Sequence, residues 1–150
     1  MHLIFHRYRL FDIYRLWNII RTKSKGCGML EKRVVIAGSR KFNDYSLFSK
    51  AVDTCLSRIR NEYAIVILSG HCSGTDLMAE RYAEENGFRV EVFPADWSLG
   101  RKAGPLRNKQ MVDVADFAIA FPSGGPGTRS LIDLAQKKGI PIRVFPVVTE

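Results

Sequence analysis

Residues 64–76 read AIVILSGHCSGTD, a continuous apolar run that is followed directly by serine, glycine and threonine. A short apolar run of this kind is typical of a strand that is buried on both faces, as in a parallel sheet. The polar segment 69–76 is then the turn that leads from this strand into a helix. This strand–turn–helix unit is the pattern from which the rest of the chain can be interpreted.

The same pattern recurs on both sides of this segment. Apolar runs at 34–37, 88–93, 115–121 and 140–145 predict four further strands. Helical periodicity predicts helices over 44–58, 76–85, 106–114 and 128–138, with Asp44 as an N-cap and Gly87 and Gly139 as helix ends. Alternating strands and helices with short links predict an α/β fold, a single Rossmann-like three-layer domain with a five-stranded parallel sheet.

Composition narrows the class of protein. The chain has 150 residues, of which 46% are hydrophobic and 25% charged, as in globular proteins. No run approaches the roughly 18–20 apolar residues of a membrane span. The three cysteines, Cys27, Cys55 and Cys72, are far apart, which argues against a disulfide framework or a structural zinc site and favours a reducing cytoplasm.

Charge separates the first 28 residues from the remainder. Residues 1–28 carry a net charge of +5, against +3 for residues 29–150. We expect residues 1–28 to be a poorly structured basic extension that the fold does not need, with Met29 as the natural start, and residues 29–150 to form the domain. A basic helix that binds a membrane surface or a partner is the alternative interpretation of this segment.

Polar, glycine-containing segments follow four of the predicted strands. Ligands of open parallel sheets bind at the carboxyl ends of the strands, so these segments should converge on one site. The candidate ligand-binding residues are Gly38, Ser39, Arg40, Ser69, Gly70, Gly74, Thr75, Asp76, Arg107, Asn108, Ser123, Gly124, Gly125, Gly127 and Thr128.

The chemistry of this set is that of a phosphate cradle. Glycine-rich turns that open a helix offer backbone N–H groups and the positive end of the helix dipole to an anion. Arg40 and Arg107 could pair with phosphate oxygens. Asp76 could hold a sugar hydroxyl or cap its own helix, and Trp97 could stack on a base or only cover its loop.

Other residues near this site carry weaker signals. Arg101 and Lys102 are expected to be solvated surface charges rather than ligand contacts. His71 has no partner at metal-ligand spacing, so no metal site is expected, and Cys72 is disfavoured as a nucleophile. The chain contains neither G-x-x-x-x-G-K-[ST] nor G-x-G-x-x-G after the first strand, which disfavours P-loop enzymes and ordinary dinucleotide dehydrogenases.

Four motifs, in order, resemble the SLOG superfamily, which is named after the DNA-processing protein DprA/Smf and the LOG cytokinin-activating enzymes. They are Gly38-Ser39-Arg40, Ser69-Gly70-x-x-x-Gly74-x-Asp76, Ala103-Gly104-Pro105-x-Arg107-Asn108 and Gly124-Gly125-x-Gly127-Thr128. The resemblance spans roughly residues 32–146 and is strongest to the YspA/YpsA-related branch, whose members mostly lack an assigned role. Related domains are proposed as sensors of nucleotide signals in phage and conflict systems. The resemblance implies a Rossmann-like sheet and a site for a nucleotide or nucleotide-derived ligand.

The resemblance also limits the activity that can be expected. LOG enzymes hydrolyse the N-glycosidic bond of nucleoside monophosphates and carry a Gly-Gly-x-Gly-Thr-x-x-Glu motif. In this chain Leu131 occupies the position of that glutamate, and leucine cannot handle protons. LOG-type hydrolysis is therefore disfavoured unless Asp76 or Asp133 replaces the glutamate.

Three functions remain open. The first is a sensor or sequestering module for a nucleotide-like ligand, such as a nucleoside monophosphate, ADP-ribose or an NAD-related molecule. The second is a nucleotide N-glycosidase or phosphoribohydrolase, and the third is a single-stranded DNA-binding domain like that of DprA, which the small net charge of residues 29–150 supports only weakly. A homo-oligomer is a further expectation.

Overall fold

The computed structural model describes residues 28–149. The predictions for residues 1–28, except for Gly28, lie outside the described residues and stay predictions. Every helix and strand named below belongs to the compact unit Glu31–Glu150. Within residues 28–149, no helix combines the length and the apolar content that crossing a bilayer requires.

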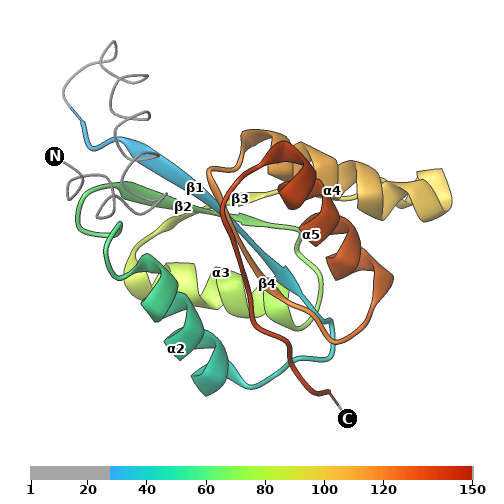
Figure 1. The fold of residues 1–150 in the computed structure, drawn as a ribbon, viewed down its shortest axis with the longest axis horizontal. Coiled ribbons are helices and arrows are strands. Elements are labelled where there is room, and N and C mark those ends of the chain that lie inside the picture. Colours follow the sequence, from blue (N-terminus) through green and yellow to red (C-terminus); the bar gives the residue numbers. More distant parts are fainter. Residues whose placement is uncertain (1–27, 150) are drawn as a thin grey trace, which may run out of the picture. The chain divides into compact units, whose positions relative to one another are not determined.

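A five-stranded parallel sheet forms the centre of this unit, as predicted (Figure 1). The strands are β1 (Glu31–Gly38), β2 (Ala64–Ser69), β3 (Arg89–Val92), β4 (Phe117–Phe121) and β5 (Ile142–Val144), in the order β3-β2-β1-β4-β5. The connecting helices are α2 (Tyr45–Leu56), α3 (Thr75–Asn86), the 3₁₀ helix η1 (Trp97–Lys102), α4 (Ala103–Val114) and α5 (Pro126–Lys138).

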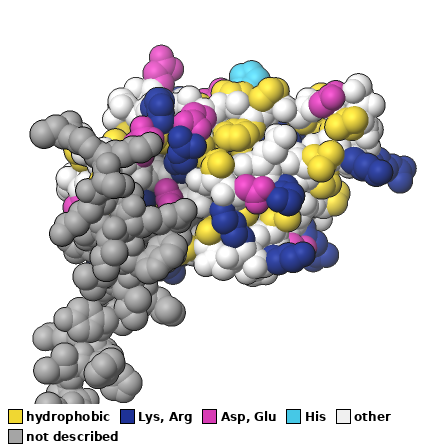
Figure 2. All heavy atoms as spheres, turned by 90° about the horizontal axis from the view of Figure 1, so that it is seen from above, with side chains coloured by type: hydrophobic (Ala, Val, Ile, Leu, Met, Phe, Trp, Pro, Cys, Tyr) yellow, Lys and Arg dark blue, Asp and Glu magenta, His cyan; other side chains and the backbone are white. Residues whose placement is uncertain are grey.

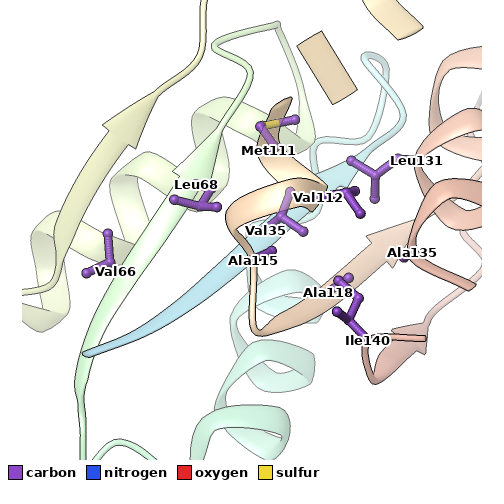
Figure 3. Close-up of a cluster of buried hydrophobic side chains, with 10 residues drawn as sticks. All are labelled: Val35, Val66, Leu68, Met111, Val112, Ala115, Ala118, Leu131, Ala135 and Ile140. Carbon is purple, nitrogen blue, oxygen red and sulfur yellow. The ribbon is translucent and has the colours of Figure 1, made fainter. Parts of the chain in front are cut away.

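Helices cover both faces of the sheet, with α2 and α3 on one face and α4 and α5 on the other (Figure 1). On the second face, Val35 of β1 packs in a buried cluster with Met111 of α4 and Leu131 of α5 (Figure 3). Successive side chains of a strand point to opposite faces, so Val34 and Ile36 point to the first face. Both layers of helices are therefore fixed by the continuous apolar run of β1.

Aromatic side chains fill the core on the α2 and α3 face. The ring of Phe48 from α2 lies 5.1 Å from that of Phe121 and 6.2 Å from that of Tyr82, measured between centroids. Asp44 caps α2 as predicted, since its carboxylate accepts a hydrogen bond of 3.0 Å from the backbone N–H of Leu47. The packing thus positions α2 and α3 against the sheet near the end of β4.

The element boundaries differ from the predictions mainly after β3. The segment before α4 was expected to be a loop, but it forms η1, and α4 begins at Ala103 rather than at Leu106. The change of backbone direction occurs at Gly100, whose φ of 62° is in the left-handed region that favours glycine. Because η1 is short and lacks apolar periodicity, nothing in the sequence distinguishes it from a loop.

The order of the strands reverses between β1 and β4. The chain moves outward from β1 through β2 to β3, then crosses to β4 and β5 on the other side. The crossovers that follow β1 and β4 consequently diverge at the carboxyl ends of these strands. A hollow at this position is the usual ligand site of an open parallel sheet.

Gly38, the last residue of β1, is predicted to be indispensable for packing. A Cβ atom at this position would lie 2.5 Å from the carbonyl oxygen of Phe121 and 2.7 Å from Oγ1 of Thr75. We expect Gly38→Ala to lower the free energy of unfolding by about 1–3 kcal/mol, because backbone atoms of β4 must move. Chemical denaturation monitored by circular dichroism measures this change.

Gly104→Ala is the matched control, because a Cβ atom there meets nothing within 4 Å. Gly104 lies in the first turn of α4, where alanine should leave stability unchanged or raise it by up to ~1 kcal/mol. Equal stability of the two variants would contradict the packing role of Gly38.

Candidate functional site

A cleft of about 810 Å³ lies at the carboxyl ends of β1 and β4, within the usual size range of ligand sites. Its walls come from the segment after β1, the first turn of α3, η1, α4 and the first turn of α5. The sequence-predicted residues that line it are Gly38, Ser39, Arg40, Asp76, Arg107, Asn108, Ser123, Gly125, Gly127 and Thr128. The structure thus brings residues from four predicted segments to one cleft.

Five predicted residues, Ser69, Gly70, Gly74, Thr75 and Gly124, do not line the cleft. Thr75 holds the segment after β1, since both its N–H, at 3.2 Å, and its hydroxyl, at 3.0 Å, donate to the carbonyl oxygen of Ser39. Gly74 has a φ of 75°, and a Cβ there would lie 2.5 Å from the carbonyl oxygens of Ser39 and Arg40. Thr75 and Gly74 therefore hold the segment after β1, which lines the cleft, without lining it themselves.

The turn after β2 is held by a polar network around Glu80 of α3. The buried hydroxyl of Ser69 donates to Oε1 of Glu80 at 2.7 Å and accepts from the N–H of His71 at 3.1 Å. Nδ1 of His71 lies 2.9 Å from Oε1 of Glu80. The carboxylate of Glu80 is therefore the partner of the His71 ring. The φ of His71 is 57°, a left-handed value that is uncommon outside glycine, and the hydrogen bonds of its N–H and its ring hold it there.

Arg107 of α4 forms a buried wall of the cleft. Its Nη1 donates to the carbonyl oxygen of Gly70 at 2.7 Å, and within residues 28–149 the one hydrogen bond of Nη2 is to the Sγ atom of Cys72, at 3.9 Å. A Cβ atom at Gly70 would lie 2.3 Å from Nη1, so only glycine leaves room for the guanidinium. Across residues 28–149, Arg107 forms no ion pair with a carboxylate.

Asn108 connects this arginine to α5. Its Oδ1 accepts a hydrogen bond of 3.2 Å from Nε of Arg107, and its Nδ2 donates to the carbonyl oxygen of Gly127 at 3.1 Å. Asn108 is itself buried. The orientation of the guanidinium is thereby coupled to the first turn of α5.

Asp76 lies in the first turn of α3 and is only 6% exposed. Of the two roles expected for it, that of the N-cap is wrong, because the N-cap residue is Gly74. Its Oδ2 instead accepts a hydrogen bond of 3.1 Å from the N–H of Cys72. Burial raises the pKa of this carboxyl to about 6, although the Cys72 hydrogen bond and the charge of Arg107 act in the opposite direction.

The rim of the cleft is basic and more exposed. The guanidinium of Arg40 lies over the ring of Trp97, 5.5 Å from its centroid, and Lys41 lies beside it in the chain. Arg101 was expected to be only a solvated surface charge; it is exposed, but it also lines the cleft, whereas Lys102 does not. The N-terminus of α5 faces the same cleft with no side-chain cap, and its first residue, Pro126, has no N–H.

Several lining residues were not predicted. Lys41, Gly100 and Pro105 adjoin predicted segments, so a wider window around each motif would have included them. Thr149 belongs to no motif, so no pattern in the sequence indicates that it lines the cleft. It reaches the cleft because the segment after β5 continues along the end of β4, where the N–H of Val147 donates to the carbonyl oxygen of Pro122 at 2.9 Å.

Neither the position of the LOG glutamate nor Asp133, one of its two proposed replacements, supplies an acid to the cleft from α5. Leu131 is fully buried in the cluster beneath α4 and α5, and Asp133 is exposed outside the cleft. Asp76 is the only carboxylate among the described residues that line the cleft.

The raised pKa of Asp76 predicts a pH-dependent stability difference between the wild-type protein and Asp76→Asn. The native carboxyl keeps its proton up to about pH 6, above its ordinary pKa of 3.8, so ionisation opposes folding as the pH rises through this interval. At pH 8 we expect the variant to be more stable by roughly 1–3 kcal/mol, and the difference to vanish near pH 4. Thermal and urea unfolding across this pH range measure the effect.

Asp133→Asn is the control, because Asp133 is exposed on α5 and outside the cleft. Its stability should follow that of the wild type at each pH. A destabilised Asp76→Asn at pH 8 would contradict the cost assigned to the buried charge.

Comparisons with known proteins agree with this fold, and the matching family model covers the first two of the four motifs. The model of the YspA, cpYpsA-related SLOG family matches residues 32–100. Gene 61 protein of Mycobacterium phage D29 is 41% identical over 122 residues, which cover 76% of this chain and 96% of that protein.

Two solved structures are similar in fold. DNA processing protein A (DprA) from Streptococcus pneumoniae superposes with a TM-score of 0.62 and 18% identity, covering 77% of this chain and 50% of that one, so the chain spans half of its length. The structure of TM1055 has a TM-score of 0.55 and 19% identity, covering 74% of this chain and 72% of that one. The sequence match and the five-stranded parallel sheet together show that the chain belongs to the YspA, cpYpsA-related SLOG family.

Proposed function

We propose that the cleft binds a nucleotide or nucleotide-derived ligand, and that the protein acts as a sensor or sequestering module for it. The observation that carries this proposal is the charge of the lining, in which Arg40, Lys41, Arg101 and Arg107 stand against Asp76 alone. Such an excess of cations in a concave site at the reversal of strand order favours a small anionic ligand.

The buried arginine strengthens the argument. Arg107 is only 8% exposed and has carbonyl, amide and thiol partners but no carboxylate in the described part of the chain. A buried charge that forms no ion pair is costly, and an anion in the cleft would offset this cost. The exposed cations of the rim would attract the same anion from solution.

The first turn of α5 is the position we assign to a phosphate. Gly125 and Gly127 present backbone without side chains, and Thr128 places a hydroxyl in the lining. Because no side chain caps this helix, its terminal N–H groups and the positive end of its dipole are available to an anion. Trp97, which is 58% exposed at the rim, offers a face on which a base could stack.

Binding is favoured over N-glycoside hydrolysis by the position of Leu131. The residue that replaces the LOG glutamate is fully buried in the apolar cluster, so no acid approaches the cleft from α5. Asp76 is the one carboxyl group in the described lining that could exchange a proton. Its pKa of about 6 is close to the value that suits a general acid, so the enzymatic alternative depends on this residue.

Single-stranded DNA binding has less support. On the face drawn in Figure 2, lysine and arginine side chains lie among acidic and apolar ones and form no continuous basic track. The closest ion pairs of the described chain, such as Lys109 with Asp113 at 2.7 Å, neutralise part of the surface charge. The cations of the cleft are sufficient for a small ligand but do not define a long groove.

Thermal unfolding in the presence of AMP, CMP, NAD, ADP-ribose and cyclic AMP tests the proposed function. A ligand at ten times its Kd should stabilise the native state by roughly 1.4 kcal/mol, which corresponds to a rise in Tm of roughly 4 °C. We expect at least one of these ligands to reach this shift at millimolar concentration. No shift with any of them would overturn nucleotide binding.

The Arg40→Ala variant tests whether the nucleotide binds in the cleft. Arg40 is exposed and contacts the ring of Trp97, so its removal should weaken a nucleotide by about fivefold without unfolding the protein. Arg58→Ala, with the same loss of charge outside the cleft, should leave the Kd unchanged. An equal loss in both variants would indicate general attraction by net charge.

The enzymatic alternative is tested by release of free base. We expect the purified protein to release no adenine from AMP or nicotinamide from NAD during prolonged incubation, as measured by chromatography, because α5 provides no acid. Release that disappears in Asp76→Asn would instead assign hydrolysis to this site and make Asp76 the proton donor.

A further inference from the structure

One carboxylate oxygen of the buried residue Asp76 has no hydrogen-bond partner among the described residues. Oδ2 accepts the hydrogen bond from Cys72, but Oδ1 accepts none from any residue in the described range 28–149. Asp76 is 94% buried, as its exposed fraction of 6% implies, and it lines the cleft. Buried carboxylate oxygens are normally satisfied, so an orphan oxygen at a cleft indicates a missing donor.

A donor with an incomplete set of partners lies close by. In the described part of the chain, Nη2 of Arg107 has a single hydrogen-bond partner, the weakly accepting Sγ atom of Cys72 at 3.9 Å. Both groups pack against Gly70, where a Cβ atom would lie 2.3 Å from Nη1 of Arg107 and 2.9 Å from Oδ2 of Asp76. Among the described residues no ion pair joins the two side chains, and both residues line the cleft, so each keeps hydrogen-bonding capacity that a ligand could use.

We propose that Asp76 and Arg107 form a subsite for the ribose diol of the ligand, so that the cleft selects ribonucleotides over 2′-deoxyribonucleotides. This inference rests on the proposed function. A hydroxyl group can donate to Oδ1 of Asp76 while its oxygen accepts from Nη2 of Arg107. Two adjacent hydroxyls of one sugar can satisfy both protein groups together.

The position of Asp76 and Arg107 in the cleft suits the sugar of a nucleotide better than its base or its phosphate. Arg40, Lys41, Trp97 and the backbone of residues 125–127 are exposed, whereas Asp76 and Arg107 belong to the buried part of the lining. A base stacked at the rim and a phosphate at the helix terminus leave the sugar that joins them to face the interior wall. Loss of one hydroxyl would leave a buried carboxylate unpaired, which is why the discrimination should be strong.

The experiment compares AMP with 2′-deoxy-AMP and 3′-deoxy-AMP by isothermal titration calorimetry on the full chain. We expect at least a tenfold higher Kd for 2′-deoxy-AMP than for AMP, because the missing 2′-hydroxyl is the proposed donor to Asp76. Because phosphate and base are the same in all three probes, the ratio of Kd values reports the sugar alone.

Asp76→Asn tests the assignment to this residue. An asparagine that keeps its oxygen toward Cys72 presents an NH₂ group, a donor, where Oδ1 accepted, so the ratio between AMP and 2′-deoxy-AMP should fall below threefold. Asp133→Asn, outside the cleft, should keep the wild-type ratio. The unfolding transition of each variant shows whether it is folded, and the comparison of probes on the wild type needs no variant at all.

The outcomes separate the two proposals. Equal Kd values for AMP and both deoxy compounds overturn the diol subsite and leave nucleotide binding intact. Binding of none of the AMP probes, together with no shift in the wider panel, overturns both. Discrimination between GMP and AMP with no effect of the sugar would assign the carboxylate to a guanine edge and also overturn the diol subsite.

Discussion

The hydrogen bond from Arg107 to the carbonyl oxygen of Gly70, at 2.7 Å, is the contact on which the cleft depends. It joins α4 to the turn after β2, and Asn108 extends the connection to the first turn of α5. The contact requires glycine at position 70, since any Cβ would occupy the place of the guanidinium. Three segments that are distant in sequence are thus held at one edge of the sheet by a single buried cation.

The sheet topology explains why these segments can meet. Parallel strands bring all their carboxyl ends to one edge, and the reversal of order between β1 and β4 opens the space between the crossovers. Thr75 and Gly74 then fix the segment after β1 from the α3 side. The apolar cluster beneath α4 and α5, which includes Leu131, holds the opposite wall (Figure 3).

Apolar runs and helical periodicity were sufficient to predict the five parallel strands and four of the five connecting helices, because burial on both faces leaves a direct mark on β1, β2 and β4. The grouping of Arg40, Asp76, Arg107 and Thr128 around one hollow also followed from the topology. Local spacing could not reveal contacts across the fold. The cap at Gly74 rather than at Asp76, the Glu80 network and the approach of Thr149 all depend on tertiary packing.

The cleft keeps two buried charges of opposite sign close together without an ion pair, an arrangement that lowers stability when no ligand is present. A direct pair between Asp76 and Arg107 would satisfy both groups and hold the pKa of the carboxyl down, yet burial raises this pKa to about 6. The guanidinium is committed instead to the carbonyl oxygen of Gly70, against which both side chains pack. In the proposed complex, the ligand would place its hydroxyls between these groups and its phosphate beside the arginine. It would thereby remove the cost of the unpaired carboxylate and that of the unpaired guanidinium. Ligand binding would then be coupled to the stability of the turn after β2 and the first turn of α5, which is the coupling that a sensor requires.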